Sequence, residues 1–223
     1  MKKVSMVLAA FLLLACSTKN EDQDPLVCVY EPSPITVVSF SGVGDNLIHE
    51  TVYLDALTSD GSYDFTKMYE DVADDMRKSD IAFINQETIL GGSELGLSGY
   101  PSFNSPSEIA SDLKESGFNL VNLATNHTLD RGLSGIVNEL NTFSSVKGMV
   151  VDGAYTSQEA YDTIPTFEVK GITFSFLAYT YGTNGIRPEY SYEVSYFDDA
   201  QITSDVQRAK EISDVVIVSA HWG

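Results

Sequence analysis

Short apolar runs alternate with amphipathic stretches along the chain from residue 35 onward. Runs rich in β-branched and aromatic residues, typical of buried strands, occur at 35–40, 81–85, 119–124, 148–151 and 215–219. Two further runs, 165–169 and 172–179, meet around Lys170 and Gly171 and predict a β-hairpin.

Between these runs, apolar residues recur with the spacing of an α-helix. A helix ending near Lys78 is predicted by Phe65, Met68, Tyr69, Val72 and Met76. A second helix is predicted from Ser105, an N-cap followed by Pro106 and by a capping-box glutamate at 108. It ends at Gly117, a residue type that favours the C-cap.

Further helices are predicted around Leu133, Ile136, Val137 and Leu140 and over residues 199–211. Alternation of strands and helices favours an α/β fold, with a mostly parallel sheet covered by helices on both faces. In such sheets, ligands bind beyond the carboxyl ends of the strands.

The first 34 residues have a different character. Lys2 and Lys3 precede an apolar run, residues 4–15, which is short for a membrane span and suits the core of a signal peptide. The run ends in Leu-Leu-Ala-Cys, which resembles the lipobox of bacterial lipoproteins, in which the cysteine, here Cys16, carries the lipid. Plain secretory cleavage is the alternative.

We therefore expect a lipoprotein signal peptide at 1–16, a polar tether at 17–34 and one folded domain at 35–223. The expected location is the cell membrane, with the protein lipid-anchored at the extracytoplasmic face. If Cys16 is lipidated, Cys28 is the one cysteine left among the two in the chain, and no internal disulfide can form.

The net charge of the chain limits the kinds of molecule that it can bind. The chain has 13 basic and 32 acidic residues, giving a net charge of −19. Such a charge repels nucleic acid, which usually binds to a basic face. It is compatible with cation binding, although acidity also serves solubility.

Polar side chains gather where the predicted strands end. Asp45 and His49 follow the first strand, Glu87 follows the second, and His221 follows the last. The third is followed by "ATNHTLDRG", which contains Asn126, His127 and Asp130. Taken singly, each could be an ordinary loop residue. Taken together, they predict a rim of carboxylate, amide and imidazole groups in one crevice.

This mixture of ligands suits a divalent metal such as Mn²⁺, Zn²⁺, Fe²⁺ or Mg²⁺. Two ions about 3.5–4 Å apart could clamp a phosphoryl or acyl oxygen and activate a water molecule. In this interpretation His127 faces the substrate, and Asp130 orients its imidazole. Arg131 either contacts an anionic group or is a solvated surface residue.

Four segments, in order, resemble the motifs of the CapA family of capsule and poly-γ-glutamate biosynthesis proteins: "GDNLIH", "NQET", "ATNHTLDRG" and "HWG". That family has a domain similar to calcineurin-like metallophosphoesterases. The resemblance implies a metallophosphatase-like fold, metal ligands at Asp45, Glu87, Asn126 and His221, and a substrate-facing histidine at His127.

The chain departs from the family pattern in two ways. Metallophosphoesterases usually begin with Asp-x-His, but Leu47 occupies the histidine position, and His49 is the candidate to replace it. The family also continues beyond "HWG" to further ligands, so we expect the domain to be incomplete at its C-terminal end.

Two functions follow from the resemblance. One is a role in capsule or poly-γ-glutamate synthesis or export, with other synthesis proteins as partners. The other is metal-dependent hydrolysis of a phosphoester or related anionic envelope substrate.

Three other functional patterns are excluded. The segment after the first strand lacks the third glycine of a dinucleotide fingerprint, and no G-x-S-x-G elbow of a serine hydrolase occurs. The Asn126-His127-Thr128 sequon would place a glycan in the crevice.

Overall fold

Two β-sheets lie at the centre of the fold in a computed structural model that describes residues 35–222. The predictions for the signal peptide, Cys16, Cys28 and the tether concern residues outside this range. The chain divides into Met1–Ile35 and a compact unit, Thr36–Gly223, which carries every element below. Among the helices of residues 35–222, none has both the length and the apolar character needed to cross a bilayer.

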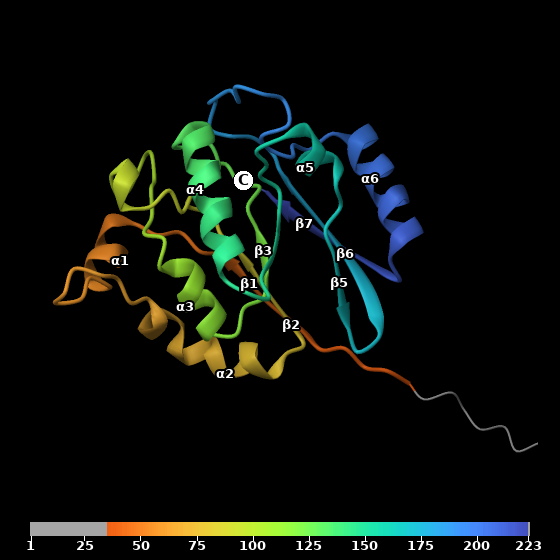
Figure 1. Cartoon of the computed structure of the whole chain (residues 1–223), viewed down its shortest axis with the longest axis horizontal. Coiled ribbons are helices and arrows are strands. Elements are labelled where there is room, and N and C mark those ends of the chain that lie inside the picture. The colour runs from red at the N-terminus through yellow and green to blue at the C-terminus, as the bar shows by residue number, and fades with distance from the viewer. Residues whose placement is uncertain (1–34, 223) are drawn as a thin grey trace, which may run out of the picture. The chain divides into compact units, whose positions relative to one another are not determined.

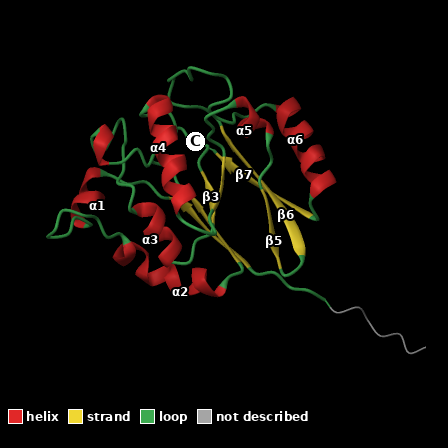
Figure 2. Ribbon diagram, in the orientation of Figure 1, coloured by secondary structure: helices red, strands yellow, loops and turns green. Residues whose placement is uncertain are grey.

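The elements follow in the order β1 (Phe40–Asp45), α1 (Glu50–Asp55), the 3₁₀ helix η1 (Thr66–Tyr69), α2 (Glu70–Lys78), β2 (Ile81–Asn85), the 3₁₀ helix η2 (Ser93–Leu95), α3 (Ile109–Glu115), β3 (Leu120–Asn122), α4 (Gly132–Ser145), β4 (Val150–Asp152), α5 (Gln158–Asp162), β5 (Thr166–Val169), β6 (Ile172–Thr180), α6 (Asp199–Ile212) and β7 (Val215–His221). Figure 2 shows their distribution by type.

The first sheet is parallel, in the order β1-β2-β3-β4, and the second has the order β5-β6-β7. In the second sheet β5 and β6 form the predicted antiparallel hairpin, and β6 pairs in parallel with β7. Lys170 and Gly171 adopt φ values of 52° and 79° at the hairpin turn. Two successive positive φ values define the tight turn that suits the right-handed twist of the strands.

Helices cover the outer side of each sheet (Figure 1). The largest apolar cluster lies under α2, α3 and α4, with Leu113, Ile136 and Phe143 against Val121 of β3. A second cluster, including Leu120, Phe174 and Phe176, lies between the two sheets. A third packs α6 against the second sheet. The molecule is therefore layered as helices, sheet, sheet, helices.

The register of the first sheet aligns one polar residue from each strand. Asp45 pairs with Asn85, Asn85 with Asn122, and Asn122 with Asp152. Paired residues of neighbouring strands share a face of the sheet. A row of polar side chains therefore crosses the carboxyl ends of all four strands.

The structure corrects three predictions. There are two sheets where one was expected, because β6 and β7 pair with each other and pack face to face with the first sheet. The first strand is Phe40–Asp45 and not 35–40, because pairing with β2 begins at Phe40. Ser105 is not an N-cap: α3 begins at Ile109, and the Ser105 hydroxyl is buried and donates to Thr88 Oγ1 (2.9 Å).

Candidate functional site

The predicted site residues occupy one edge of the two sheets. Asp45 and His221 are the last residues of β1 and β7. Glu87 lies two residues beyond β2, and Asn126 lies in the segment that joins β3 to α4. The edge is formed by residues that are distant in the chain and that end parallel strands.

Asn85 is at the centre of this edge. The Ala124 backbone N–H donates to Asn122 Oδ1 (2.8 Å), so the Asn122 amide nitrogen is free to donate to Asn85 Oδ1 (2.6 Å). The Asn85 amide nitrogen therefore faces the other way. It donates to Asp45 Oδ1 and to His221 Nδ1 (2.9 Å). One amide group thus links β1, β2, β3 and β7.

This network fixes the tautomer of His221. Because Nδ1 accepts from Asn85, the ring proton is on Nε2, which donates to Asn126 Oδ1 (2.8 Å). Burial lowers the pKa of the His221 imidazole, while the nearby Asp45 carboxylate opposes this shift and His127 adds to it. The ring is thereby kept neutral, the form that binds metals. Tyr181 stacks on it, with ring centroids 6.1 Å apart.

Glu87 is half-buried beside the same group. Burial raises the pKa of its carboxyl above the usual range, the charge of Asp45 raises it further, and His127 lowers it. Its backbone oxygen accepts from Thr125 Oγ1 (2.8 Å), which ties the loop after β2 to the segment that carries Asn126. Two carboxylates at one edge create negative potential, which favours a cation.

His127 and Asp130 form the contact expected from their spacing. His127 Nδ1 donates to Asp130 Oδ2 (2.7 Å), and the backbone N–H of Phe103 donates to the same oxygen (2.6 Å). Both side chains are buried. The Phe103 ring lies edge-on to His127, with centroids 4.7 Å apart. Nε2 is the ring nitrogen of His127 left for a substrate.

His49 is not joined to the other candidates. It is the exposed N-cap of α1, and its ring lies edge-on against Phe103, 5.0 Å between centroids. No hydrogen bond or ion pair within residues 35–222 connects its side chain to Asp45, Glu87, Asn126 or His221. Its predicted role as a metal ligand gains no support.

The predicted metal ligands can be compared with the geometry of the edge. Within residues 35–222, no group of three or more His, Cys, Asp or Glu side chains is close enough to hold an ion. Asp45 Oδ1 and His221 Nδ1 are 3.7 Å apart, a separation that two ligands at about 2.0–2.2 Å from one ion can have. Asn126 Oδ1 faces the opposite nitrogen of the His221 ring. The donor types are ones that divalent metals bind, and the distance between Asp45 Oδ1 and His221 Nδ1 is compatible with a shared ion.

Several residues of the edge are missing from the sequence prediction. Asn85 and Asn122 are the last residues of predicted strands, and the rule that linked strand ends to the site could have found them. Asn184 accepts from Asn126 Nδ2 (3.2 Å) and comes from an Asn-Gly turn, a pattern that predicts the turn but does not link it to the site. Arg131 is half-buried, and its guanidinium donates to Ser98, to Ser102 and to the backbone carbonyl of Asp130.

A comparison with protein families identifies the chain. A family model described as "Bacterial capsule synthesis protein PGA_cap" matches residues 39–223. The chain belongs to this family. The match spans every strand of both sheets and all the candidate site residues, so the PGA_cap domain includes the whole edge described above.

Among curated proteins, the PGA_cap chain is similar to the "PGA biosynthesis protein CapA" of Bacillus subtilis (strain 168). The two are 28% identical over 113 residues, which is 50% of this chain and 30% of that protein. The chain thus matches less than a third of the length of that relative.

Among solved structures, a proposed 5′-nucleotidase from Staphylococcus aureus in complex with alpha-ketoglutarate superposes with a TM-score of 0.48 and 16% identity. The alignment covers 83% of this chain and 37% of that one. Similarity at this level adds nothing to the family assignment.

Proposed function

We propose that this PGA_cap protein is a CapA-like, lipid-anchored surface protein that acts in capsule or poly-γ-glutamate biosynthesis or export and binds a divalent metal at the carboxyl edge of its sheets. The family match supports the role in capsule synthesis. The observation that carries the metal site is the meeting of Asp45, Asn85, Asn126 and His221 at one edge.

Asp45 and His221 are the proposed first ligands, and Glu87 is the proposed third. Asn126 is the proposed fourth, and its Oδ1, which accepts from His221 Nε2 in this structure, must turn away from that nitrogen to join them. In this structure the Asn85 amide is the donor that two acceptors, Asp45 Oδ1 and His221 Nδ1, share. A bound cation would interact with the same two acceptors, and it would carry a full positive charge in place of the partial charge of an amide N–H. A bound divalent ion would lower the pKa of its water to about 7 and would polarise a phosphoryl or acyl oxygen.

A second candidate function is metal-dependent hydrolysis of an anionic envelope phosphoester. The His127–Asp130 pair favours it, because a histidine held by a buried carboxylate is a common acid or base. Asp130 fixes the ring and keeps the proton on Nδ1, so that Nε2 can receive a proton from a substrate. The Phe103 ring limits the movement of the imidazole.

The N-terminal sequence and the net charge support the proposed location and argue against one class of partner. We propose a lipid anchor on Cys16, with the folded unit on the extracytoplasmic side. Other capsule or poly-γ-glutamate synthesis proteins are the proposed partners. The net charge of −19 argues against nucleic acid.

Metal binding is tested by calorimetric titration of the purified protein with Mn²⁺. We expect saturable binding that Asp45→Asn and His221→Ala each weaken at least about tenfold, in line with the loss of a ligand. Asp74→Asn, which changes an exposed carboxylate of α2, is the matched control and should bind as the unchanged protein does. Equal affinity in all four proteins would exclude this site.

Activity separates the two functions. Mn²⁺-dependent turnover of a generic phosphoester, lost in Asn126→Ala and His127→Ala, would favour the hydrolase. Metal binding without turnover, together with loss of surface polymer when the gene is deleted, would favour the role in synthesis or export.

A further inference from the structure

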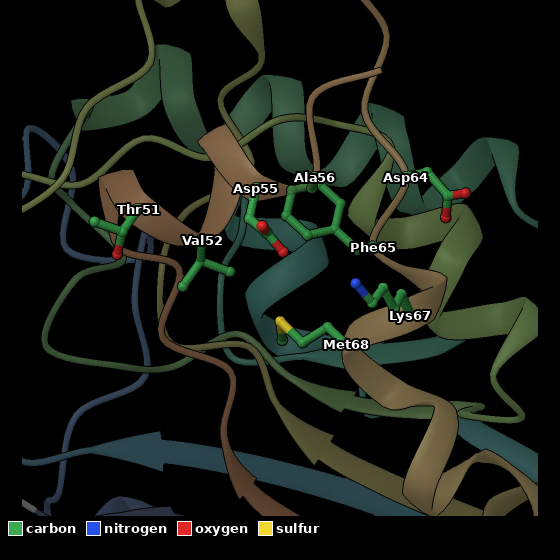
Figure 3. A pocket seen from close by; sticks show the side chains of 8 residues that line it. All are labelled: Thr51, Val52, Asp55, Ala56, Asp64, Phe65, Lys67 and Met68. Carbon is green, nitrogen blue, oxygen red and sulfur yellow. The ribbon is translucent and has the colours of Figure 1, made fainter. Parts of the chain in front are cut away.

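A cavity of about 410 Å³ lies between α1 and η1, away from the sheet edge (Figure 3). Its apolar wall consists of Val52, Ala56, Phe65 and Met68. Phe65 is fully buried, whereas Met68 is 46% exposed. A volume near the lower end of the range for ligand sites suits a small molecule.

Two opposite charges point into this cavity from opposite walls. Figure 3 shows the Asp55 carboxylate, from α1, and the Lys67 ammonium, from η1, directed into the space between the two elements. Neither forms an ion pair with any residue of 35–222, so they are not within 4.0 Å of each other. The other acidic residue, Asp64, points away and accepts hydrogen bonds from the Thr66 backbone and hydroxyl.

Asp55 sits at the unfavourable end of a helix. Asp55 is the last residue of α1, where unpaired carbonyl groups already create negative potential. Lys67 is the second residue of η1 and provides the positive charge of the other wall. The Asp55 wall therefore attracts a cation, and the Lys67 wall attracts an anion.

We propose that this cavity binds a small amphoteric ligand, an apolar α-amino acid, with its ammonium group against Asp55 and its carboxylate against Lys67. The apolar side chain of the ligand then covers Val52 and Met68. One such molecule carries a positive charge for Asp55, a negative charge for Lys67 and an apolar side chain for the apolar wall. This site is separate from the proposed metal site and does not depend on it.

The test is calorimetric titration of the purified protein with L-leucine. A chelator in the buffer keeps metal ions from binding the amino-acid carboxylate at the sheet edge. We expect saturable binding at one site. N-acetyl-L-leucine lacks the ammonium and L-leucinamide lacks the carboxylate, and each should bind about tenfold more weakly, as expected for a lost hydrogen bond between charged groups.

Substitutions of Asp55 and Lys67 then test which of the two residues binds the ammonium and which binds the carboxylate of the ligand. Asp55→Asn should weaken L-leucine binding about tenfold and leave N-acetyl-L-leucine binding unchanged. Lys67→Met should weaken L-leucine binding by a similar factor and leave L-leucinamide binding unchanged. Asp74→Asn and Lys78→Met, both at exposed positions on α2, are the matched controls and should have no effect.

Two outcomes would overturn the proposal. One is the absence of saturable binding of L-leucine and L-phenylalanine at millimolar concentrations. The other is equal binding of L-leucine and its two blocked analogues. If a variant does not fold, the analogue series on the unchanged protein still decides, since it requires no substitution.

Discussion

Gly153 lies directly after β4, where the chain passes so close to the loop before Asn126 that a side chain does not fit. Its φ is +107°, a conformation that residues with a Cβ rarely adopt. A Cβ placed there would be 2.5 Å from the backbone nitrogen of Ala124. This single glycine therefore sets the distance between β4 and the segment that carries Asn126 and His127.

Gly153→Ala should lower the free energy of unfolding by about 2 kcal/mol or more, because it combines backbone strain with a steric clash against backbone atoms. Urea denaturation followed by circular dichroism measures this. Gly182→Ala is the matched control, since a Cβ there meets no atom within 4 Å, and it should change stability by less than about 0.5 kcal/mol. Similar losses in the two variants would contradict the interpretation of Gly153.

At the scale of elements, α4 holds the loop after β2 in place. This helix starts where the Asn126–His127 segment ends, and its Glu139 carboxyl accepts a hydrogen bond from the Leu90 backbone N–H (3.1 Å). Burial raises the pKa of Glu139 to about 8, and the hydrogen bond from Leu90 opposes this rise. The carboxyl that joins the two site-bearing segments is therefore largely neutral at pH 7.

The sign of the resulting pH dependence follows from that shift. The pKa of Glu139 in the folded protein is above the ordinary value of 4.5. The stability it contributes is therefore complete below about pH 4.5 and is lost as the pH rises through about 8. Glu139→Gln cannot ionise and lacks this dependence.

Urea unfolding of the two proteins over this pH range is the measurement. As the pH rises between the two pKa values, we expect the free energy of unfolding of Glu139→Gln to increase relative to that of the unchanged protein. The expected increase is up to about 1.4 kcal/mol per pH unit. If the free energy of unfolding of the two proteins changed with pH in the same way, the raised pKa of Glu139 would be contradicted.

Over the whole molecule, Asp152 joins the two sheets. It ends β4, and its Oδ2 accepts the backbone N–H of Ala178 in β6 (2.9 Å). Its Oδ1 accepts from the Tyr155 hydroxyl (2.9 Å), which also contacts Ser195 (3.0 Å). Because β6 pairs with β7, this carboxyl also fixes the strand that ends in His221 relative to the first sheet.

Asp152→Ala should cost about 2–4 kcal/mol, since it leaves the Ala178 N–H and the Tyr155 hydroxyl buried without their partner. Asp152→Asn keeps an acceptor for the N–H and can donate to the tyrosine oxygen. Burial raises the pKa of Asp152 to about 7, and the hydrogen bond from Tyr155 opposes this rise. Because an amide cannot ionise, Asp152→Asn does not pay the free-energy cost of ionising a buried carboxyl at high pH.

Urea unfolding near pH 8 should consequently rank Asp152→Asn at or above the unchanged protein, and Asp152→Ala well below both. Equal stability of the two variants would mean that the hydrogen bonds to Asp152 do not hold the sheets together.

Much of the secondary structure could be predicted, because it depends on the pattern of residues that are close together in the sequence. The helices α2, α4 and α6 and the strands β2, β6 and β7 follow periodicities that neighbouring residues impose on one another. The shared edge was also predictable. Parallel strands end on the same side of a sheet, so Asp45 and Glu87, which follow β1 and β2, had to lie at one edge once these strands were assigned. His221 ends β7 of the second sheet and reaches this edge through the packing of the two sheets.

The amino-acid sequence by itself thus determined the element types, the family motifs and the edge at which the polar residues meet. Only the tertiary structure decided that β6 and β7 form a separate sheet, that Ser105 bonds to Thr88, and that Asn85 is the centre of the site. These outcomes depend on contacts between distant parts of the chain: Asn85 and His221 are 136 residues apart. The direction in which an amide donates is fixed by such partners, and no local pattern contains them.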